Sequence, residues 1–263
     1  LATEAEDWES VAGLLEHRFD LASGARHRAS IAVEASQIHL HQRRSPASAR
    51  VWVERAIELA DDDGSVLRAR ADLARADGHD DELAALIERL VQKAGRRPQR
   101  FMLVELAEIH ARKGRPAAAL AALERAPASL PGNDLPVLEL RAQCLRDTGA
   151  KRELAEVLET LVTLESGQTP ILRAARLREL AELSEDELSD PATAETHWNA
   201  AFALVPTDPE ALASLTRLQR KREDWSALRS TFERAVDASG PTSLRPLYDQ
   251  LGLLLLEHFE DHE

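Results

Sequence analysis

Residues 103–131 read LVELAEIHARKGRPAAALAALERAPASLP and carry two helical patterns in succession. Leu106 and Ala107 lie midway along the first pattern, and Gly114 follows it. In the second pattern apolar residues recur at the three-to-four residue spacing of an amphipathic helix, at Ala119, Leu123 and Ala126. Glycine commonly follows the end of a helix because it adopts a left-handed backbone without steric cost. The stretch therefore predicts a hairpin of two antiparallel helices.

The same pattern returns along the chain. A small residue recurs on the first helix of each predicted hairpin about every 35 residues, a period typical of helical repeats: Ser36, Ala71, Ala107, Ala142, Ala181, Thr216 and Gly252. A bulky apolar residue recurs on the second helices: Leu15, Val53, Ile87, Leu123, Leu158, Trp198 and Phe232. We expect the four alanines of the first series to be buried where two helices approach closely.

The hairpin at 103–131 resembles the tetratricopeptide repeat (TPR). The shared features are the large–small pair on the first helix, the turn glycine, the small–large–small series on the second helix and the closing Pro131. His110 and Pro116 stand where that family often has aromatic residues. The resemblance implies an all-α fold, a right-handed α-solenoid of antiparallel helix hairpins with about seven units, in which first helices line a concave groove.

The spacing predicts a single domain over 1–263. We expect helix pairs at 28–60, 65–94, 98–128, 135–165, 170–205 and 208–238, with half-hairpins at 4–22 and 244–260. The first half-hairpin repeats the second helix of the 208–238 pair, since Trp8 matches Trp225 at an offset of 225 − 8 = 217. The segment 244–260 reads as a first helix without its partner. Because the first residue is Leu, an upstream segment is expected to be missing.

Composition limits the class of partner. The net charge of −13 and the pI of about 5.2 argue against nucleic acid or an anionic membrane surface. The longest apolar run, residues 253–256, is too short to span a membrane. A single cysteine, Cys144, excludes an internal disulfide and is expected to be a buried small hydrophobe. Together these features predict a cytoplasmic protein.

No pattern in the sequence supports catalysis or cofactor binding. Glycine-rich phosphate loops, nucleophile elbows and paired-cysteine metal motifs are missing from the sequence. His258 and His262 have helical spacing, but a metal needs three or four ligands. We therefore predict that the protein is not an enzyme and that it binds neither a cofactor nor a metal. Of the tryptophans, Trp8, Trp198 and Trp225 are expected to pack in the core, and Trp52 to be partly exposed.

In the TPR family, residues just after the small position of the first helix point into the groove. The resemblance therefore implies a candidate protein-binding surface on the first helices. The predicted surface residues are Gln37, Arg68, Asp72, Arg75, Glu108, Gln143, Arg146, Glu182, Arg217, Arg220 and Lys221. Cations dominate this set, interrupted by acids around Glu182. Such a groove suits a peptide or helix of another protein. Solvated helix faces carry similar charges, and the pattern leaves both interpretations open.

The first functional hypothesis is thus a non-enzymatic scaffold for an unidentified protein or peptide ligand. Capture of a terminal carboxylate by Lys and Asn is not expected, because neither Asn133 nor Asn199 falls on a groove position. A second hypothesis is a structural segment that associates with a second copy or with neighbouring domains, suggested by the half-hairpins and the leucines at 251–256. The third is a regulatory or sensory segment of a larger protein containing an enzyme or transcription-factor domain.

Overall fold

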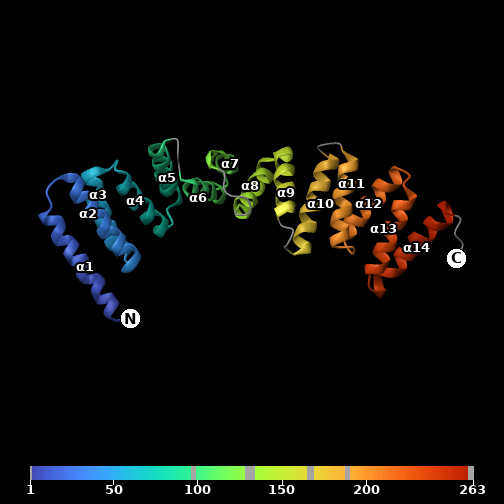
Figure 1. Cartoon of the computed structure of the whole chain (residues 1–263), viewed down its shortest axis with the longest axis horizontal. Coiled ribbons are helices and arrows are strands. Elements are labelled where there is room, and N and C mark those ends of the chain that lie inside the picture. The colour runs from blue at the N-terminus through green and yellow to red at the C-terminus, as the bar shows by residue number, and fades with distance from the viewer. Residues whose placement is uncertain (1, 96–98, 128–133, 165–168, 187–189, 260–263) are drawn as a thin grey trace. The chain divides into compact units, whose positions relative to one another are not determined.

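The computed structural model describes residues 2–95, 99–127, 134–164, 169–186 and 190–259 (Figure 1). Across these ranges the chain forms fourteen α-helices and one short π-helix, and it contains no strand. The all-α prediction is therefore confirmed. The number of repeat units and the hand of the solenoid stay predictions.

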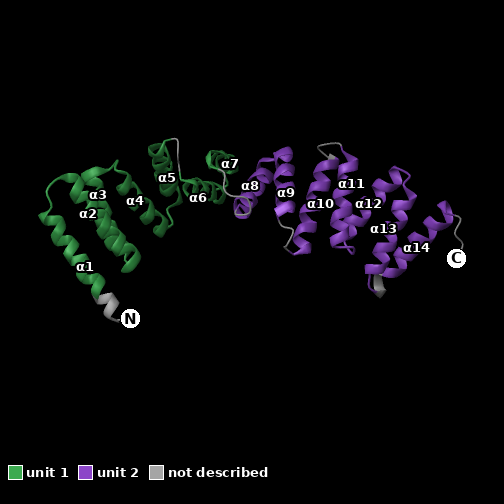
Figure 2. Cartoon of the chain, in the orientation of Figure 1, with its two compact units in different colours: residues 1–129 green, residues 130–263 purple. Residues whose placement is uncertain are grey.

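The helices divide between two compact units, residues 1–129 and 130–263 (Figure 2). Unit 1 contains α1 (Ala2–Leu21), α2 (Ala25–Gln37), the π-helix η1 (Ile38–Gln42), α3 (Pro46–Ala60), α4 (Gly64–Asp77), α5 (Asp80–Ala94), α6 (Arg100–Arg112) and α7 (Pro116–Arg125). The pairs α2/α3, α4/α5 and α6/α7 pack as hairpins, and each hairpin contacts the next. Helix α1 packs on α2 and η1.

Unit 2 repeats this arrangement. It contains α8 (Leu135–Thr148), α9 (Lys151–Leu164), α10 (Pro170–Asp186), α11 (Pro191–Leu204), α12 (Pro209–Lys221), α13 (Trp225–Ala238) and α14 (Pro241–His258). The hairpins are α8/α9, α10/α11 and α12/α13, and α14 packs on α13. The predicted organisation, one domain over 1–263 with its repeat boundaries, stays a prediction.

Local sequence explains where the helices begin and end. Gly78 and Gly149 follow α4 and α8 with φ angles of 71° and 72°, the left-handed conformation expected of turn glycines. Prolines occupy the first turn of α3, α7 and α11, where a missing N–H costs no helical hydrogen bond. Asp208 and Asp224 accept backbone hydrogen bonds at the start of α12 and α13.

The small-residue positions lie where the repeat predicts. Ala71 is 3% exposed, and Ala107, Ala142 and Ala181 are 0% exposed, so the expected burial is confirmed. Gly252 differs, because a Cβ atom placed on it would meet nothing within 4 Å. Close helix approach therefore governs the first helices up to α10 but not α14.

The expected partial exposure of Trp52 is wrong. Its side chain is buried, and its ring meets Phe19 of α1 edge to face with 5.4 Å between centroids. Packing of α1 against the first complete hairpin supplies this contact, which spacing within 28–60 does not reveal. The other packing positions differ among themselves: Trp198 is fully buried, and Trp8 and Trp225 are half-buried.

The π-helical turn after α2 is a feature that the sequence pattern did not predict. It widens the helix around His39, whose side chain is buried with Nδ1 3.4 Å from Nη1 of Arg43. Burial, and then the charge of Arg43, lower the pKa of His39 below its usual value of 6.5. The imidazole is therefore held preferentially in its neutral form.

Candidate protein-binding groove

The predicted surface residues all lie on helices that open a hairpin. Unit 1 carries Gln37 on α2, three residues on α4 and Glu108 on α6; unit 2 carries the rest on α8, α10 and α12. Asp72 is half-buried, and the other ten are exposed, namely Gln37, Arg68, Arg75, Glu108, Gln143, Arg146, Glu182, Arg217, Arg220 and Lys221. Within each unit these residues come from the first helices of successive hairpins, and a shared binding face stays a prediction.

In unit 1 four of these residues surround one hollow of about 130 Å³ between α4 and α6. Its polar lining is Gln37, Arg68, Asp72, Arg75 and Glu105, and its apolar lining is Ala71, Ile87, Leu90, Phe101 and Met102. A wider depression of about 540 Å³ adjoins it along α6, lined by Arg100, Phe101, Val104, Glu105 and Glu108. We call the two hollows together the Phe101 groove.

Phe101 is the apolar centre of this groove. Its side chain is 61% exposed, and it lines both hollows. A large aromatic residue left in water beside a concave apolar floor is the kind of anchor that protein interfaces use. A solvated helix face would explain the charged residues of the groove. The exposure of the phenyl ring favours a binding surface instead.

Arg75 does not offer a free charge to a ligand. Its Nε and Nη2 donate to the two carboxylate oxygens of Glu105 at 2.5 and 2.9 Å, and its Nη1 donates to Asp72 at 2.7 Å. The hydrogen bonds to Glu105 are the main reason that the pKa of the guanidinium is raised. This fork joins the first helices of two successive hairpins.

The same fork recurs in unit 2. Arg146 of α8 donates to both oxygens of Glu179 on α10 at 2.6 and 2.8 Å. Arg217 of α12 reaches back to Glu185 of α10 at 2.6 Å, and the same carboxylate accepts a hydrogen bond from Trp198. Three of the predicted groove cations therefore link neighbouring hairpins.

Arg68 has a different environment. Over the ranges that the structure describes it forms neither an ion pair nor a side-chain hydrogen bond, and it lines the smaller hollow. Arg220 and Lys221 at the end of α12 are likewise exposed and without such a partner there. A ligand carboxylate could reach any of these three cations without displacing a protein acid.

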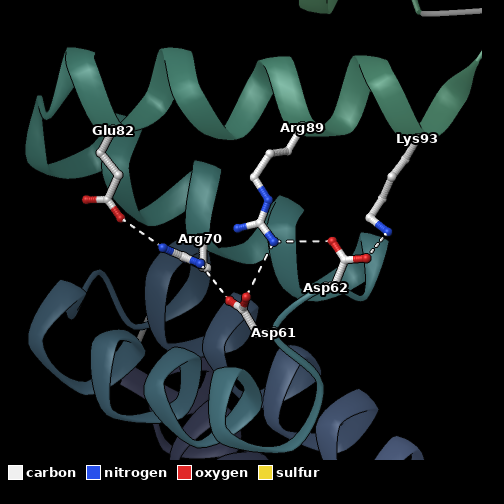
Figure 3. Close-up of polar contacts among 6 residues, drawn as sticks. All are labelled: Asp61, Asp62, Arg70, Glu82, Arg89 and Lys93. Carbon is white, nitrogen blue, oxygen red and sulfur yellow. Dashed lines mark hydrogen bonds and ion pairs between the residues drawn. The ribbon is translucent and has the colours of Figure 1, made fainter.

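A second concentration of charge, in unit 1, is internally neutral (Figure 3). Asp61 and Asp62, in the turn before α4, lie between Arg70 of α4 and two cations of α5, Arg89 and Lys93. Glu82 completes the cluster through Arg70 at 3.6 Å. With three acids opposite three bases, the cluster ties α5 to the preceding turn and has no excess charge for a ligand.

Unit 2 has its own hollow, of about 260 Å³, between α12, α13 and α14. Its lining includes Arg220, Trp225, Leu253 and His258. The rings of Trp225 and His258 stack with their centroids 3.6 Å apart. This hollow combines an unpaired cation with exposed apolar surface, as the Phe101 groove does.

The described residues contain no group of three or more metal-ligating side chains. His262, half of the histidine pair considered above, lies outside them. Cys144 is buried, as expected, and burial raises the pKa of its thiol, which disfavours the thiolate. Within the same residues, none of the helices combines the length and the apolar character needed to cross a membrane.

Neither a protein-family model nor a curated protein matches the sequence. Among solved structures, the chain is similar to YrrB, described as a TPR protein with an unusual peptide-binding site, at 16% identity and a TM-score of 0.49. That match covers 71% of this chain and 91% of YrrB. A tetratricopeptide repeat protein from Parabacteroides merdae matches at 11% identity and a TM-score of 0.49, over 95% of this chain and 93% of the other.

The hairpins and their buried small residues, observed directly, decide the fold. It is a TPR-like array of helical hairpins. The identities of the matched structures are too low to carry a function to this chain.

Two residues of the Phe101 groove, Phe101 and Glu105, were not predicted from the sequence. Phe101 lies six residues before the small position Ala107, and Glu105 lies two before it. All the expected groove positions except Arg68 follow the small position of their helix. Phe101 could have been noticed because it is an aromatic residue in the first turn of α6, at a position that usually faces solvent. Glu105 could not be assigned in this way, because its partner Arg75 belongs to the preceding hairpin.

Proposed function

We propose that this chain is a non-enzymatic scaffold that binds an extended or helical segment of a partner protein in the Phe101 groove. The observation that carries the proposal is the exposed phenyl ring of Phe101 above an apolar floor, with the unpaired Arg68 lining the same hollow. Interfaces of this kind gain most of their affinity from a central apolar anchor and much of their specificity from nearby charge.

The chemistry of the groove specifies the ligand in part. An apolar side chain would pack on Phe101, Ala71 and Leu90, and an acidic group close to it would pair with Arg68. Acidic Glu105 and Glu108 line the α6 side of the groove and would disfavour acids there. The expected ligand is thus an apolar–acidic segment whose acid is directed toward α4.

The test is selection from a random peptide library with the whole chain, followed by measurement of dissociation constants for the selected peptides. Phe101→Ser should weaken binding at least about tenfold, because it removes the anchor. Arg68→Glu should weaken binding of peptides with an acid near their apolar anchor, and this effect should shrink as salt screens the charge.

Matched controls separate the groove from general surface effects. Ile171→Ser removes an exposed apolar residue of α10, and Arg152→Glu reverses an exposed cation of α9. Both should bind like the unaltered protein. The proposal fails if no peptide is selected, or if selected peptides bind Phe101→Ser and Arg68→Glu with unchanged affinity.

A further inference from the structure

A further hollow in unit 1, of about 220 Å³, lies between α3, α4 and the start of α5, and we call it the Glu54 pocket. Its floor is aliphatic and consists of Val53, Ile57, Leu73 and Ala74. Charged side chains surround this floor: Arg50, Glu54, Arg70, Asp77 and Glu82. The volume equals that of about seven molecules of liquid water. It therefore suits one long side chain better than a drug-sized molecule.

The Glu54 pocket and the Phe101 groove lie on different faces of α4. Leu73 and Asp77 line the pocket, whereas Ala71 and Arg75 line the groove. Residues two apart on an α-helix point in directions about 200° apart, because the helix has 3.6 residues per turn. A ligand in the pocket would therefore leave the groove open.

The arginines of the pocket are already paired with acids. Arg50 of α3 donates a hydrogen bond to Asp77 of α4 at 2.5 Å, and Arg70 of α4 donates to Asp61 at 2.9 Å. Each guanidinium thus has a carboxylate at hydrogen-bonding distance, which offsets most of its repulsion of a second cation. The arginines consequently do not exclude a basic ligand from the pocket.

Two carboxylates of the pocket are available to a ligand. Across the residues that the structure describes, Glu54 forms neither an ion pair nor a side-chain hydrogen bond. Glu82, part of the neutral cluster described above, is held loosely, since it lies 3.6 Å from Arg70 and 4.0 Å from His79. Both distances are longer than a normal hydrogen bond. Glu54 therefore supplies one negative charge in excess, and Glu82 can turn to a second partner.

We propose that the Glu54 pocket binds the side chain of an arginine from a partner protein. The methylene groups of this arginine would lie on Ile57 and Leu73, and its guanidinium would donate hydrogen bonds to Glu54 and Glu82. A guanidinium fits better than the ammonium of lysine, because its planar fork can bind two carboxylates at once. Its single positive charge balances the excess acid. The net charge of −13 also favours a basic segment as partner.

The probe is a blocked five-residue peptide with arginine at its centre and alanine elsewhere, and the same peptide with citrulline is its uncharged match. The whole chain, with ¹³C-labelled isoleucine methyl groups, reports binding by NMR. Ile57 lines the pocket, Ile87 lines the Phe101 groove, and Ile171 is exposed on α10. The Ile57→Val variant identifies the Ile57 signal by its loss.

The Ile57 signal should shift and saturate as the arginine peptide is raised to about 10 mM, a range that covers millimolar dissociation constants. The citrulline peptide should leave this signal unmoved, because it lacks the charge. The signals of Ile87 and Ile171 should stay in place with both peptides. Added salt should weaken the binding of the arginine peptide by screening the carboxylates.

Substitutions locate the binding groups. Glu54→Gln and Glu82→Gln should each weaken binding of the arginine peptide at least about threefold, because each removes a charged hydrogen-bond acceptor. Glu124→Gln, at an exposed glutamate of α7 outside the pocket, is the matched control and should bind normally. Phe101→Ser should also bind the arginine peptide normally, so this test is independent of ligand binding in the groove.

Circular dichroism verifies that each variant keeps its helices before its affinity is compared. The proposal is wrong if the Ile57 signal does not move, if the citrulline peptide moves it equally, or if both glutamate variants bind with unchanged affinity. A shift confined to Ile87 would also contradict it, because the arginine would then occupy the groove.

Discussion

Enlarging the small side chain at Ala107 should destabilise the array. Ala107 is 0% exposed on α6, which packs against both α5 and α7. Ala107→Leu adds three carbon atoms at a position without solvent exposure, and overpacking of this kind typically costs about 1–3 kcal/mol in the free energy of unfolding. Alanine and leucine are both strong helix formers, so the change in propensity contributes little.

Ala121→Leu on α7 is the matched control, because Ala121 is exposed and receives the same three carbons. Urea unfolding followed by far-ultraviolet circular dichroism gives the midpoint and the slope for each variant. The midpoint should fall for Ala107→Leu and stay nearly constant for Ala121→Leu, with equal slopes if cooperativity is preserved. Equal stability of the two variants would refute the role assigned to the small-residue positions.

Three further predictions follow from the structure. Gly252→Ala should raise the free energy of unfolding by about 0.5–1 kcal/mol, measured by urea titration of dilute protein, because helix propensity improves and the Cβ meets nothing within 4 Å. A double-mutant cycle on Arg75 and Glu105 should give a coupling of about 1 kcal/mol or less that weakens with salt, since both side chains are partly exposed. The lowered pKa of His39 means that the unfolded chain binds protons more readily, so stability should fall as pH drops below 6.5, and His39→Gln should reduce that slope in urea titrations at several pH values.

The fold could be predicted because its determinants are local and periodic. Small residues such as Ala71 and Ala107 repeat at the interval of one hairpin. Each turn glycine ends a helix through the conformation of its own backbone. The exposure of Trp52 was predicted wrongly because its burial is not local. Phe19, which covers its ring, belongs to α1, outside the hairpin that contains Trp52. The π-helical turn at His39 also has no periodic signature.

For the candidate site, the sequence could predict only which helices carry its residues. Knowing which helix of each hairpin opens toward the groove placed Arg68 and Arg75 on the same surface. It could not show that Arg75 is held by Glu105 while Arg68 has no such partner, because the relevant acid lies 30 residues away in the next hairpin. Spacing gives the direction of a side chain, and the neighbouring repeat decides whether its charge is available.

This difference determines how the groove would recognise an acidic ligand. A ligand carboxylate approaching Arg75 must compete with Glu105 and Asp72, which already accept its hydrogen bonds, so it gains only the difference between two similar interactions. At Arg68 the same carboxylate replaces water alone, and the adjoining apolar floor lowers the local dielectric. Charge reversal at Arg68 should therefore change ligand affinity, whereas neutralising Arg75 should chiefly change the stability of the contact between α4 and α6.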